Sequence, residues 1–251
     1  VADGGDIGKS IRDGVSKRMA LTDNVKTIVV IYAENRGFDN LYGLFPGANG
    51  IPGVNPSSTG TAVAQKDFDG SVLPTLPPTW GGLTAAGQSV TVTQAQTTGW
   101  PNKMFQIDDP AGVNGTGIVV PQTVTTRDLW HRFYQNQMQI NDGKNDQFVA
   151  WGDSGGLPMG YYAQSQYSLR LWDVAREFVL CDNFFQGAFG GSFLNHQYLI
   201  SAQVPFYPDA ANSVAKSQIA TLQSDDPTDT RLKPLDKSPA SAMTGPPQFG
   251  P

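Results

Sequence analysis

An apolar run that ends in an abruptly polar stretch is the clearest pattern along the chain. The run Ile28–Ile31 is β-branched throughout, which is typical of a strand buried on both faces of a sheet. We therefore predict a strand over residues 26–32. Glu34 and Asn35 follow it directly, and in open α/β sheets ligand sites form beyond the carboxyl ends of strands.

The Glu34–Asn35 pair suggests one half of a metal site. Both side chains offer oxygen ligands, so together they could hold one edge of a hard divalent metal ion. A polar turn at the end of a strand explains the same residues equally well.

Residues 43–125 form a long excursion with little helical periodicity. This stretch is rich in Gly, Pro, Thr and Gln, which indicates loops, with short strands predicted over residues 90–92 and 117–120. So long an irregular stretch inside a domain is usually functional. We expect it to cover the mouth of the site and to shape the choice of substrate.

Helical periodicity returns after residue 126. Trp130, Tyr134 and Met138 recur at every fourth position, and this stripe predicts a helix. Thr126 or Asp128 is a plausible N-cap, and the stop signal is Asn141-Asp142-Gly143.

Two more helices and a second strand are predicted beyond this point. Leu171, Val174 and Phe178 share one face of a helix, which leads into a strand over Phe178–Cys181. A further helix starts near Ser192. A short helix over residues 11–19 and a Pro-rich tail after residue 205 complete the pattern, and the order of the elements predicts an α/β fold.

Composition excludes some classes of function. The 251 residues are 39% hydrophobic and carry a net charge of −5, which supports a real core but argues against nonspecific nucleic-acid binding. No run is long and apolar enough to span a membrane. Cys181 is the only cysteine, so no intramolecular disulfide can form. The chain starts with Val1 rather than Met, and removal of a signal peptide is one explanation.

The segment Gly152–Gly156 is the best candidate for a nucleophile loop. Its glycines leave Ser154 accessible, and backbone N–H groups in such a turn can bind an anion. A serine hydroxyl needs a base or a metal ion to activate it. No histidine lies close in sequence, so a metal ion is the simpler activator. A flexible glycine turn is the alternative.

His131 and His196 are the only histidines. His131 adjoins the Trp130 stripe, where a structural histidine is at least as plausible as a catalytic one. His196 follows Asn195 near a predicted helix start, which is a ready anion site. Lys144 adds a nearby cation, although charged residues in such loops are usually solvated.

Three blocks of sequence, taken in order, resemble one family. The blocks VKTIVVIYAENRGFDNLYG, QMQINDGKNDQFVAWGDSGGLPMGYY and CDNFFQGAFGGSFLNHQYLISA cover residues 25–43, 137–162 and 181–202. They resemble the bacterial phosphoesterase family of acid phosphatases and phosphatidylcholine-type phospholipases C, in the wording of the acid-phosphatase branch. The resemblance implies an alkaline-phosphatase-like three-layer α/β/α sandwich, of which residues 1–251 would form the amino-terminal part of a single domain.

The resemblance also implies roles for single residues. Glu34 and Asn35 match the pair that binds metal and phosphate, and Asn195 with His196 matches positions near the phosphate. The nucleophile is expected between Ser154 and Met159. Within that loop the position of the nucleophilic threonine in the lipase branch is Pro158, so Ser154 is the expected nucleophile.

Three departures from the family pattern stand out. Asn40 and Gly37 replace a usual His and Ser. Family members are commonly much longer, and further metal-binding acids and a histidine lie in their carboxyl-terminal half. Proteolysis, disorder or a separate chain that supplies the rest would account for this difference.

The sequence therefore predicts a periplasmic or secreted bacterial hydrolase. We expect metal-assisted hydrolysis of phosphomonoesters through a phosphoserine intermediate on Ser154, with a divalent metal ion, and with Asn35, Asn195, His196 and Lys144 around the phosphate. A phospholipase C that acts on choline phospholipids and an inactive binding protein with the same fold are the alternatives.

Overall fold

The computed structural model describes residues 24–204, 212, 222–226, 228–229, 231–235 and 237–248. The chain divides into two units, residues 1–34 and 35–251, and each is described by itself. The helix predicted over residues 11–19 lies outside the described residues.

The described part of the first unit, residues 24–34, contains no strand. The prediction of a buried strand over residues 26–32 is therefore wrong for this structure. Ile28, Val29, Val30 and Ile31 are 80%, 80%, 59% and 87% exposed. β-branched residues favour a strand only where a partner completes the ladder and covers the side chains, and none of the described residues pairs with this run.

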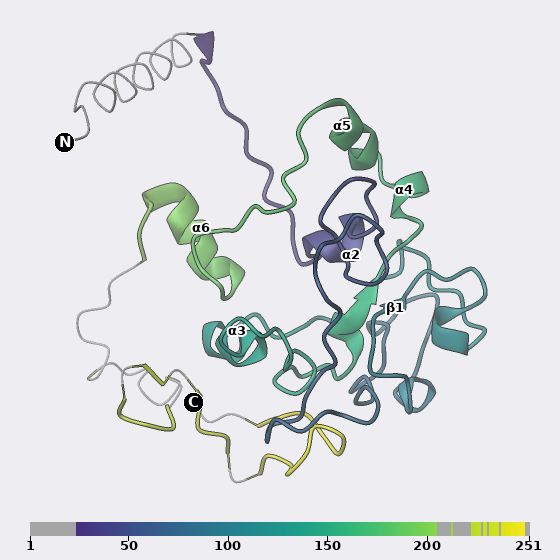
Figure 1. Ribbon diagram of the computed structural model, residues 1–251, viewed down its shortest axis with the longest axis vertical. Helices are drawn as coiled ribbons and strands as arrows, with labels where there is room; N and C mark the ends of the chain where they lie inside the picture. Colours follow the sequence, from purple (N-terminus) through teal and green to yellow (C-terminus); the bar gives the residue numbers. More distant parts are fainter. Residues whose placement is uncertain are drawn as a thin grey trace, which may run out of the picture. The chain divides into compact units, whose positions relative to one another are not determined.

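In its described residues, the second unit combines short helices with one small sheet (Figure 1). The α-helices are α2 (Phe38–Tyr42), α3 (Phe133–Ile140), α4 (Ser165–Ser168), α5 (Leu171–Glu177) and α6 (Ser192–Ser201). Among the described residues, 3-10 helices cover Ala95–Thr97, Val113–Gly115 and Leu157–Met159. The strands are β1 (Phe105–Gln106) and β2 (Gly160–Tyr161).

The sheet of the described residues is a parallel pair of two-residue strands. Phe105 pairs with Gly160 and Gln106 with Tyr161, and the Ile107 amide extends the ladder by donating to the Tyr161 carbonyl at 2.8 Å. Parallel strands that far apart in sequence need a long crossover connection, so the class is mixed α/β.

The main hydrophobic core is built largely from the irregular excursion. Its buried members are Leu73, Leu76, Leu83, Val92, Trp100, Phe105, Ile107, Val113, Val120, Val124, Val149, Leu157, Met159 and Tyr162. The strands predicted over residues 90–92 and 117–120 do not form. Burial of alternate apolar side chains in loops produces a strand-like pattern in the sequence without a ladder of paired strands. The backbone groups bond to turns and side chains instead. For example, Thr84 Oγ1 accepts a hydrogen bond from the Val92 amide at 3.1 Å.

Helix α3 begins later than the periodicity predicts. Thr126 pairs with Thr84, the Arg127 amide donates to the Leu83 carbonyl at 2.9 Å, and the Trp130 amide donates to Asp153. These bonds hold the backbone before Phe133 in an extended conformation, so neither Thr126 nor Asp128 caps the helix. The predicted stop is confirmed, since Asn141 adopts a left-handed conformation at φ 45°.

Helices α5 and α6 form where predicted, but α5 buries a different face. Trp172 is 1% exposed, whereas Leu171 and Val174 are exposed. The Trp172 indole donates to the Leu41 carbonyl at 3.0 Å and packs on Phe45, and this fixes α5 beside α2. The strand predicted over Phe178–Cys181 does not form, and Val179 is 85% exposed.

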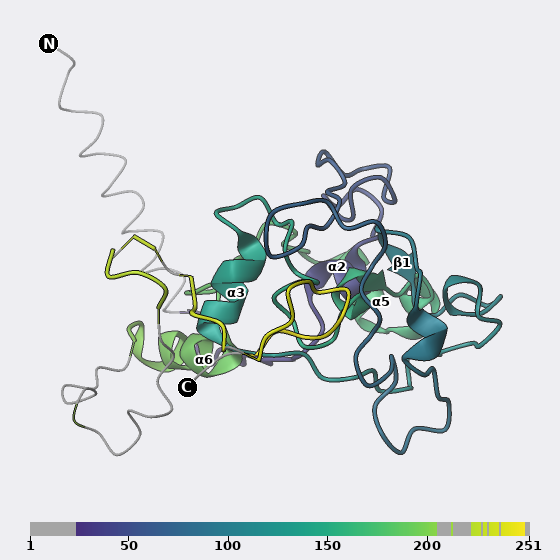
Figure 2. The same cartoon turned by 90° about the horizontal axis from the view of Figure 1, so that it is seen from below.

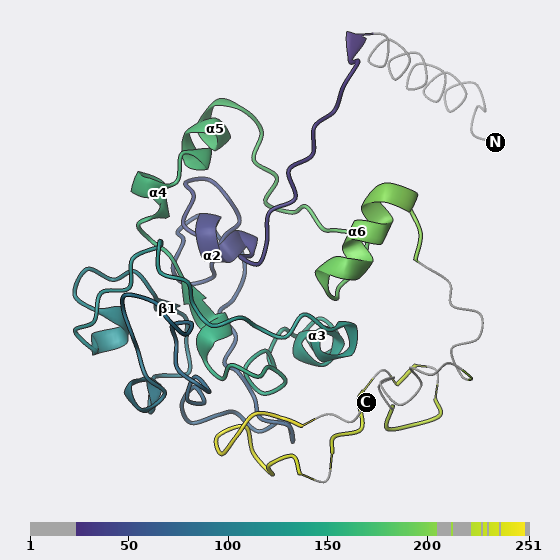
Figure 3. The same cartoon turned by 180° about the vertical axis from the view of Figure 1, so that it is seen from behind.

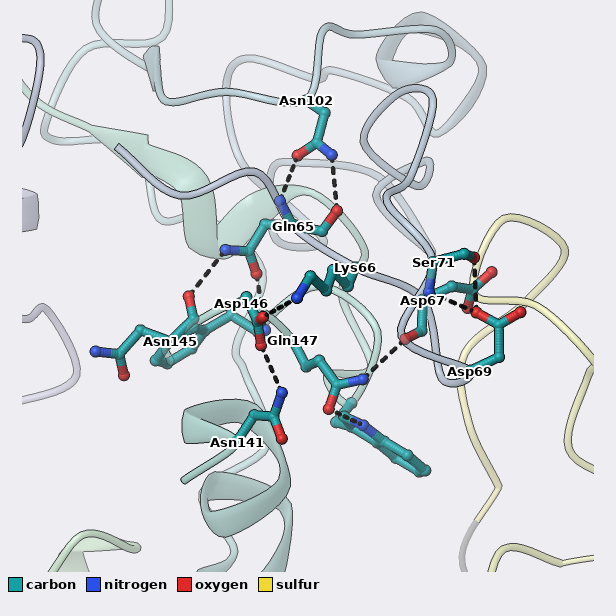
Figure 4. Close-up of polar contacts among 12 residues, drawn as sticks. Gln65, Lys66, Asp67, Asp69, Ser71, Asn102, Asn141, Asn145, Asp146 and Gln147 are labelled. Carbon is teal, nitrogen blue, oxygen red and sulfur yellow. Dashed lines mark hydrogen bonds and ion pairs between the residues drawn. The ribbon is translucent and has the colours of Figure 1, made fainter. Parts of the chain in front are cut away.

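A buried polar network ties the excursion to the turn after α3 (Figure 4). The Lys66 ammonium lies 2.8 Å from Asp146, and Asn141 donates to the same carboxylate at 2.7 Å. Burial alone would raise the pKa of Asp146, but the Asn141 hydrogen bond and the Lys66 charge outweigh it and lower that pKa. Gln65 donates to the Asn145 carbonyl at 3.1 Å and accepts from the Phe148 amide at 2.8 Å.

The described tail residues also contribute to the interior. Leu232 and Ala242 are buried, and Ala242 belongs to a second hydrophobic cluster with Met138, Ala150 and Trp151. The yellow tail runs beside the blue excursion in Figure 3. The sequence did not predict this packing, because the tail lacks a periodic apolar pattern.

Candidate functional site

Asn35 lies in a polar cluster that also contains Asp128 and His131, and we call these three residues the Asp128 cluster. The Asn35 amide nitrogen donates to Asp128 Oδ1 at 3.4 Å. His131 Nε2 lies 2.9 Å from the same oxygen. The cluster is solvent-accessible: the Asp128 side chain is exposed and the His131 ring is partly so.

The segment before α3 creates this cluster. Asp128 and His131 lie in the extended stretch that precedes Phe133. Because the neighbouring backbone is bonded to the excursion and to Asp153, the acid and the imidazole are held ahead of the helix rather than within it. The sequence predicted Asp128 as a possible N-cap and left His131 open between a structural and a catalytic role. The spacing of an acid and a histidine three positions apart was the signal for their contact.

Asp153 connects the glycine loop to the Asp128 cluster. Its carboxylate accepts from the Trp130 amide at 3.2 Å. Burial raises the pKa of Asp153, with a smaller contribution from the Asp128 charge, while the Trp130 amide and the Arg127 charge oppose that rise. The Trp130 hydrogen bond places the loop next to the segment that carries Asp128 and His131.

Ser154 is buried within the glycine loop. It is 1% exposed, and its hydroxyl has no hydrogen-bond partner among the described residues. The loop folds tightly because Gly155 has φ 55°, and a Cβ there would clash with the Pro78 carbonyl. The glycines therefore give a close backbone approach, but they do not leave the hydroxyl exposed as the sequence predicts.

Asn195 serves the loop that leads into α6. Its carboxamide accepts from the Ala188 amide at 3.0 Å and donates to the carbonyls of Ala188 and Gly191. These bonds fold the glycine-rich turn back onto the helix start. The backbone approach is close, because a Cβ on Gly191 would lie 2.7 Å from the His131 carbonyl.

The start of α6 therefore lies beside the segment that carries His131. Asn136 of α3 accepts from the Gly191 amide at 3.2 Å, and Gln137 donates to the Phe189 carbonyl at 2.6 Å. Figure 2 shows α3 and α6 side by side. His196 is exposed on α6.

Lys144 is separated from the Asp128 cluster by the length of α3. His131 precedes this eight-residue helix and Lys144 follows it, and eight helical residues span about 12 Å. Lys144 is exposed, and its charge acts on Asp146, where it helps to lower the pKa.

Asn35 retains a ligand atom for a metal ion. Its contact with Asp128 uses the amide nitrogen, so Oδ1 can still coordinate a cation. Glu34, the adjacent residue, is exposed. Within the described ranges, no three His, Cys, Asp or Glu side chains gather as a ready-made metal site.

Comparison of the sequence with known protein families identifies the class of this protein. The profile of the Phosphoesterase family matches residues 25–239, a range that includes the Asp128 cluster and the glycine loop. The chain belongs to the Phosphoesterase family. The match confirms the family predicted from the three blocks of sequence. Membership in this family implies a hydrolase that acts on phosphoesters.

No solved structure matches the chain significantly. Among the described residues, no helix has the length and apolar character needed to cross a membrane.

Proposed function

We propose that this chain hydrolyses phosphomonoesters, as an acid phosphatase does. The observation that carries the proposal is the family match together with the position of Asn35, whose amide contacts Asp128 beside His131. The glycine loop with Ser154 adjoins this cluster through the Asp153–Trp130 hydrogen bond. The wording of the second and third sequence blocks favours the phosphatase over the phospholipase C branch.

In the proposed reaction, Ser154 Oγ forms a bond to phosphorus while the bond from phosphorus to the leaving oxygen breaks. The serine proton is lost and the departing alcohol gains one. Water then attacks the phosphoserine, releases phosphate and returns a proton to Ser154. A divalent ion held by Glu34 and Asn35 would supply Lewis-acid polarisation of the phosphoryl oxygen.

The other polar groups have supporting roles in this proposal. Asn35 and His196 donate hydrogen bonds to the equatorial oxygens of the phosphoryl group. Asn195 acts on the backbone instead, because its three hydrogen bonds hold the turn before α6. Lys144, at the far end of α3, belongs to the Asp146 network.

The architecture that we propose for the whole domain is the α/β/α sandwich. The exposed apolar side chains of two runs, Ile28–Ile31 and Phe178–Val179, support it, because a larger sheet would cover such side chains. Amide protection over both runs in the native protein would agree with this architecture, and rapid exchange throughout them would count against it.

Replacement of Ser154 tests the mechanism. We expect Ser154→Ala to lower turnover of p-nitrophenyl phosphate by about a thousandfold or more, the range seen when a nucleophile is removed. Ser165→Ala removes another buried serine hydroxyl, on α4, and should retain turnover. Near-parental turnover in Ser154→Ala would remove Ser154 from the role.

Substrate comparison tests the class of ester. The acid-phosphatase proposal predicts faster hydrolysis of p-nitrophenyl phosphate than release of phosphocholine from phosphatidylcholine. Treatment with a chelator should abolish the hydrolysis, and a divalent ion should restore it. A preference for phosphatidylcholine would favour the phospholipase C instead.

A further inference from the structure

We infer that Arg36, whose guanidinium lies over the ring of Tyr162, binds the phosphoryl oxygens of the substrate. Arg36 directly follows Asn35, whose amide nitrogen donates to Asp128 at 3.4 Å. The inference rests on the function proposed above, because it adds an oxyanion-binding residue to the same site.

The Arg36 guanidinium contacts a buried aromatic ring. Its Cζ atom lies 4.3 Å from the centroid of the Tyr162 ring, and Tyr162 is 2% exposed. Burial raises the pKa of Tyr162, and Arg36 opposes that rise. Attraction to the ring orients a guanidinium, but it does not consume the five N–H donors as a carboxylate would. Arg36 is therefore oriented and can still donate to an anion.

Tyr162 is a rigid support for this contact. The two residues that follow it, Ala163 and Gln164, donate their amides to the Asp108 carboxylate at 2.9 and 2.8 Å. Asp108 is itself buried. Hydrogen bonds to a carboxylate are stronger than those between neutral groups, so the backbone on this side of the ring is held in place.

The segment that carries Arg36 is fastened to the same support. The Asn40 carbonyl accepts from the Tyr162 amide at 2.9 Å, and the Asn40 side chain donates to the Gly160 carbonyl of β2 at 2.8 Å. Arg36 and the ring beneath it are thus held by contacts between the same two stretches of chain. The position of the guanidinium does not depend on its own side-chain torsions alone.

The charge of Arg36 is not neutralised by a neighbouring acid. Arg176 provides the contrast, because it lies 5.6 Å from the Trp172 ring centroid and also pairs with Asp173 at 2.7 Å. Within the described part of the chain, Arg36 forms no ion pair of this kind. Arg36 is half-buried, and a partly desolvated cation attracts an anion more strongly than one surrounded by water.

The Asp128 cluster needs a cation if it is to accept a phosphate. A phosphomonoester carries about two negative charges near pH 7, and the Asp128 carboxylate repels them. Lys144 is separated from the cluster by α3, a length of about 12 Å. Arg36 is the chain neighbour of Asn35, and the chain bends at Asn35, so these two side chains are not held on opposite faces as they are in a strand.

Binding of inorganic phosphate tests the inference. We expect Arg36→Gln to raise the dissociation constant of phosphate about tenfold or more, as for loss of a hydrogen bond to a charged group. Arg36→Lys should give an intermediate value, because an ammonium keeps the charge but not the planar fork of donors. Arg176→Gln, which removes the ion-paired guanidinium, should bind phosphate as the parent does. Equilibrium dialysis measures the four constants.

Steady-state kinetics separate phosphate binding from a structural role. Arg36→Gln should raise the KM for p-nitrophenyl phosphate by the same factor as the dissociation constant and leave kcat within about twofold, because the contact is made in the ground state and the transition state alike. A structural role would lower kcat and the midpoint of denaturant unfolding instead. That result, with an unaltered dissociation constant for phosphate, would overturn the inference.

Two more variants identify the contact. Tyr162→Phe keeps the ring face and should bind phosphate as the parent does, whereas weakening equal to that of Arg36→Gln would assign the effect to the hydroxyl and overturn the inference. Arg132→Gln removes an exposed guanidinium next to His131 and should weaken binding far less than Arg36→Gln. Equal weakening would show an effect of net charge, which also overturns the inference.

The inference and the proposed function fail differently. If the parental chain has no phosphatase turnover but Arg36→Gln weakens its binding of phosphate, the proposed function is overturned and the role of Arg36 is supported. If the parental chain turns over p-nitrophenyl phosphate and Arg36→Gln changes neither KM nor the dissociation constant, the role of Arg36 is overturned and the proposed function remains.

Discussion

Asp128 contacts two side chains, Asn35 and His131, for which the sequence predicts different roles. Asn35 follows an apolar run, and His131 adjoins an aromatic stripe, yet both hydrogen-bond to one carboxylate oxygen. An acceptor shared in this way orients the amide and the imidazole together. The family match extends over all three residues.

Asp128→Ala should therefore affect turnover more than folding. Because the carboxylate is exposed, its removal should change the free energy of unfolding by no more than about 0.5 kcal/mol. Without their common acceptor, Asn35 and His131 lose their orientation, and we expect kcat/KM to fall about tenfold. Kinetic assays and denaturant unfolding measure the two effects. Asp142→Ala, at an exposed acid after α3, is the control, and equal turnover in both variants would contradict the prediction.

Asp153 illustrates how burial makes stability depend on pH. Its folded-state pKa is raised above 3.8, so ionisation of this carboxyl disfavours the folded state. Its contribution to stability is therefore greatest below pH 3.8 and is lost as the pH rises through the raised folded pKa.

Asp153→Asn should increase stability at neutral pH. The amide carries no charge to desolvate, and its oxygen can still accept from Trp130. Unfolding by denaturant should show a more stable variant at pH 7, with a difference that shrinks as the pH falls below 3.8. A variant that is less stable at pH 7 would show that the charged carboxylate stabilises this loop.

The helices show which features of secondary structure a local sequence pattern can predict. The end of α3 at Asn141 and the positions of α5 and α6 could be predicted, because stop signals and apolar spacing act within a turn or two of helix. The start of α3 could not be predicted. It depends on bonds from Thr126, Arg127 and Trp130 to residues of other segments.

Helix α5 offers a test of which face is buried. Trp172→Ala should lower the free energy of unfolding by about 3–5 kcal/mol, because the ring packs on Phe45 and its indole bonds to Leu41. Val174→Ala should cost no more than about 0.5 kcal/mol, since Val174 is exposed. Chemical denaturation of both variants makes the comparison. Equal losses would contradict the exposed position of Val174.

At the scale of the whole molecule, the excursion is the main source of the core. The sequence predicts a mouth-covering segment there, because residues 43–125 lack periodicity. The structure adds a structural role, since most residues of the main core lie in this range.

Leu83→Ala measures that role. Leu83 is fully buried, and its truncation should cost about 2–5 kcal/mol in global stability. Val72→Ala, at an exposed position of the same excursion, should cost no more than about 0.5 kcal/mol. A loss of stability confined to local exchange around residue 83 would indicate a detachable lid instead of a core.

The sequence by itself determined the family, the mixed α/β class and three of the helices. These depend on residue types at short spacings, which a linear pattern records. Only the tertiary structure decided that Asp128 joins Asn35 to His131, that the excursion forms most of the core, and that Ser154 is buried. Each of these contacts links residues distant in sequence, and their energies arise from burial and from partners that no local pattern specifies.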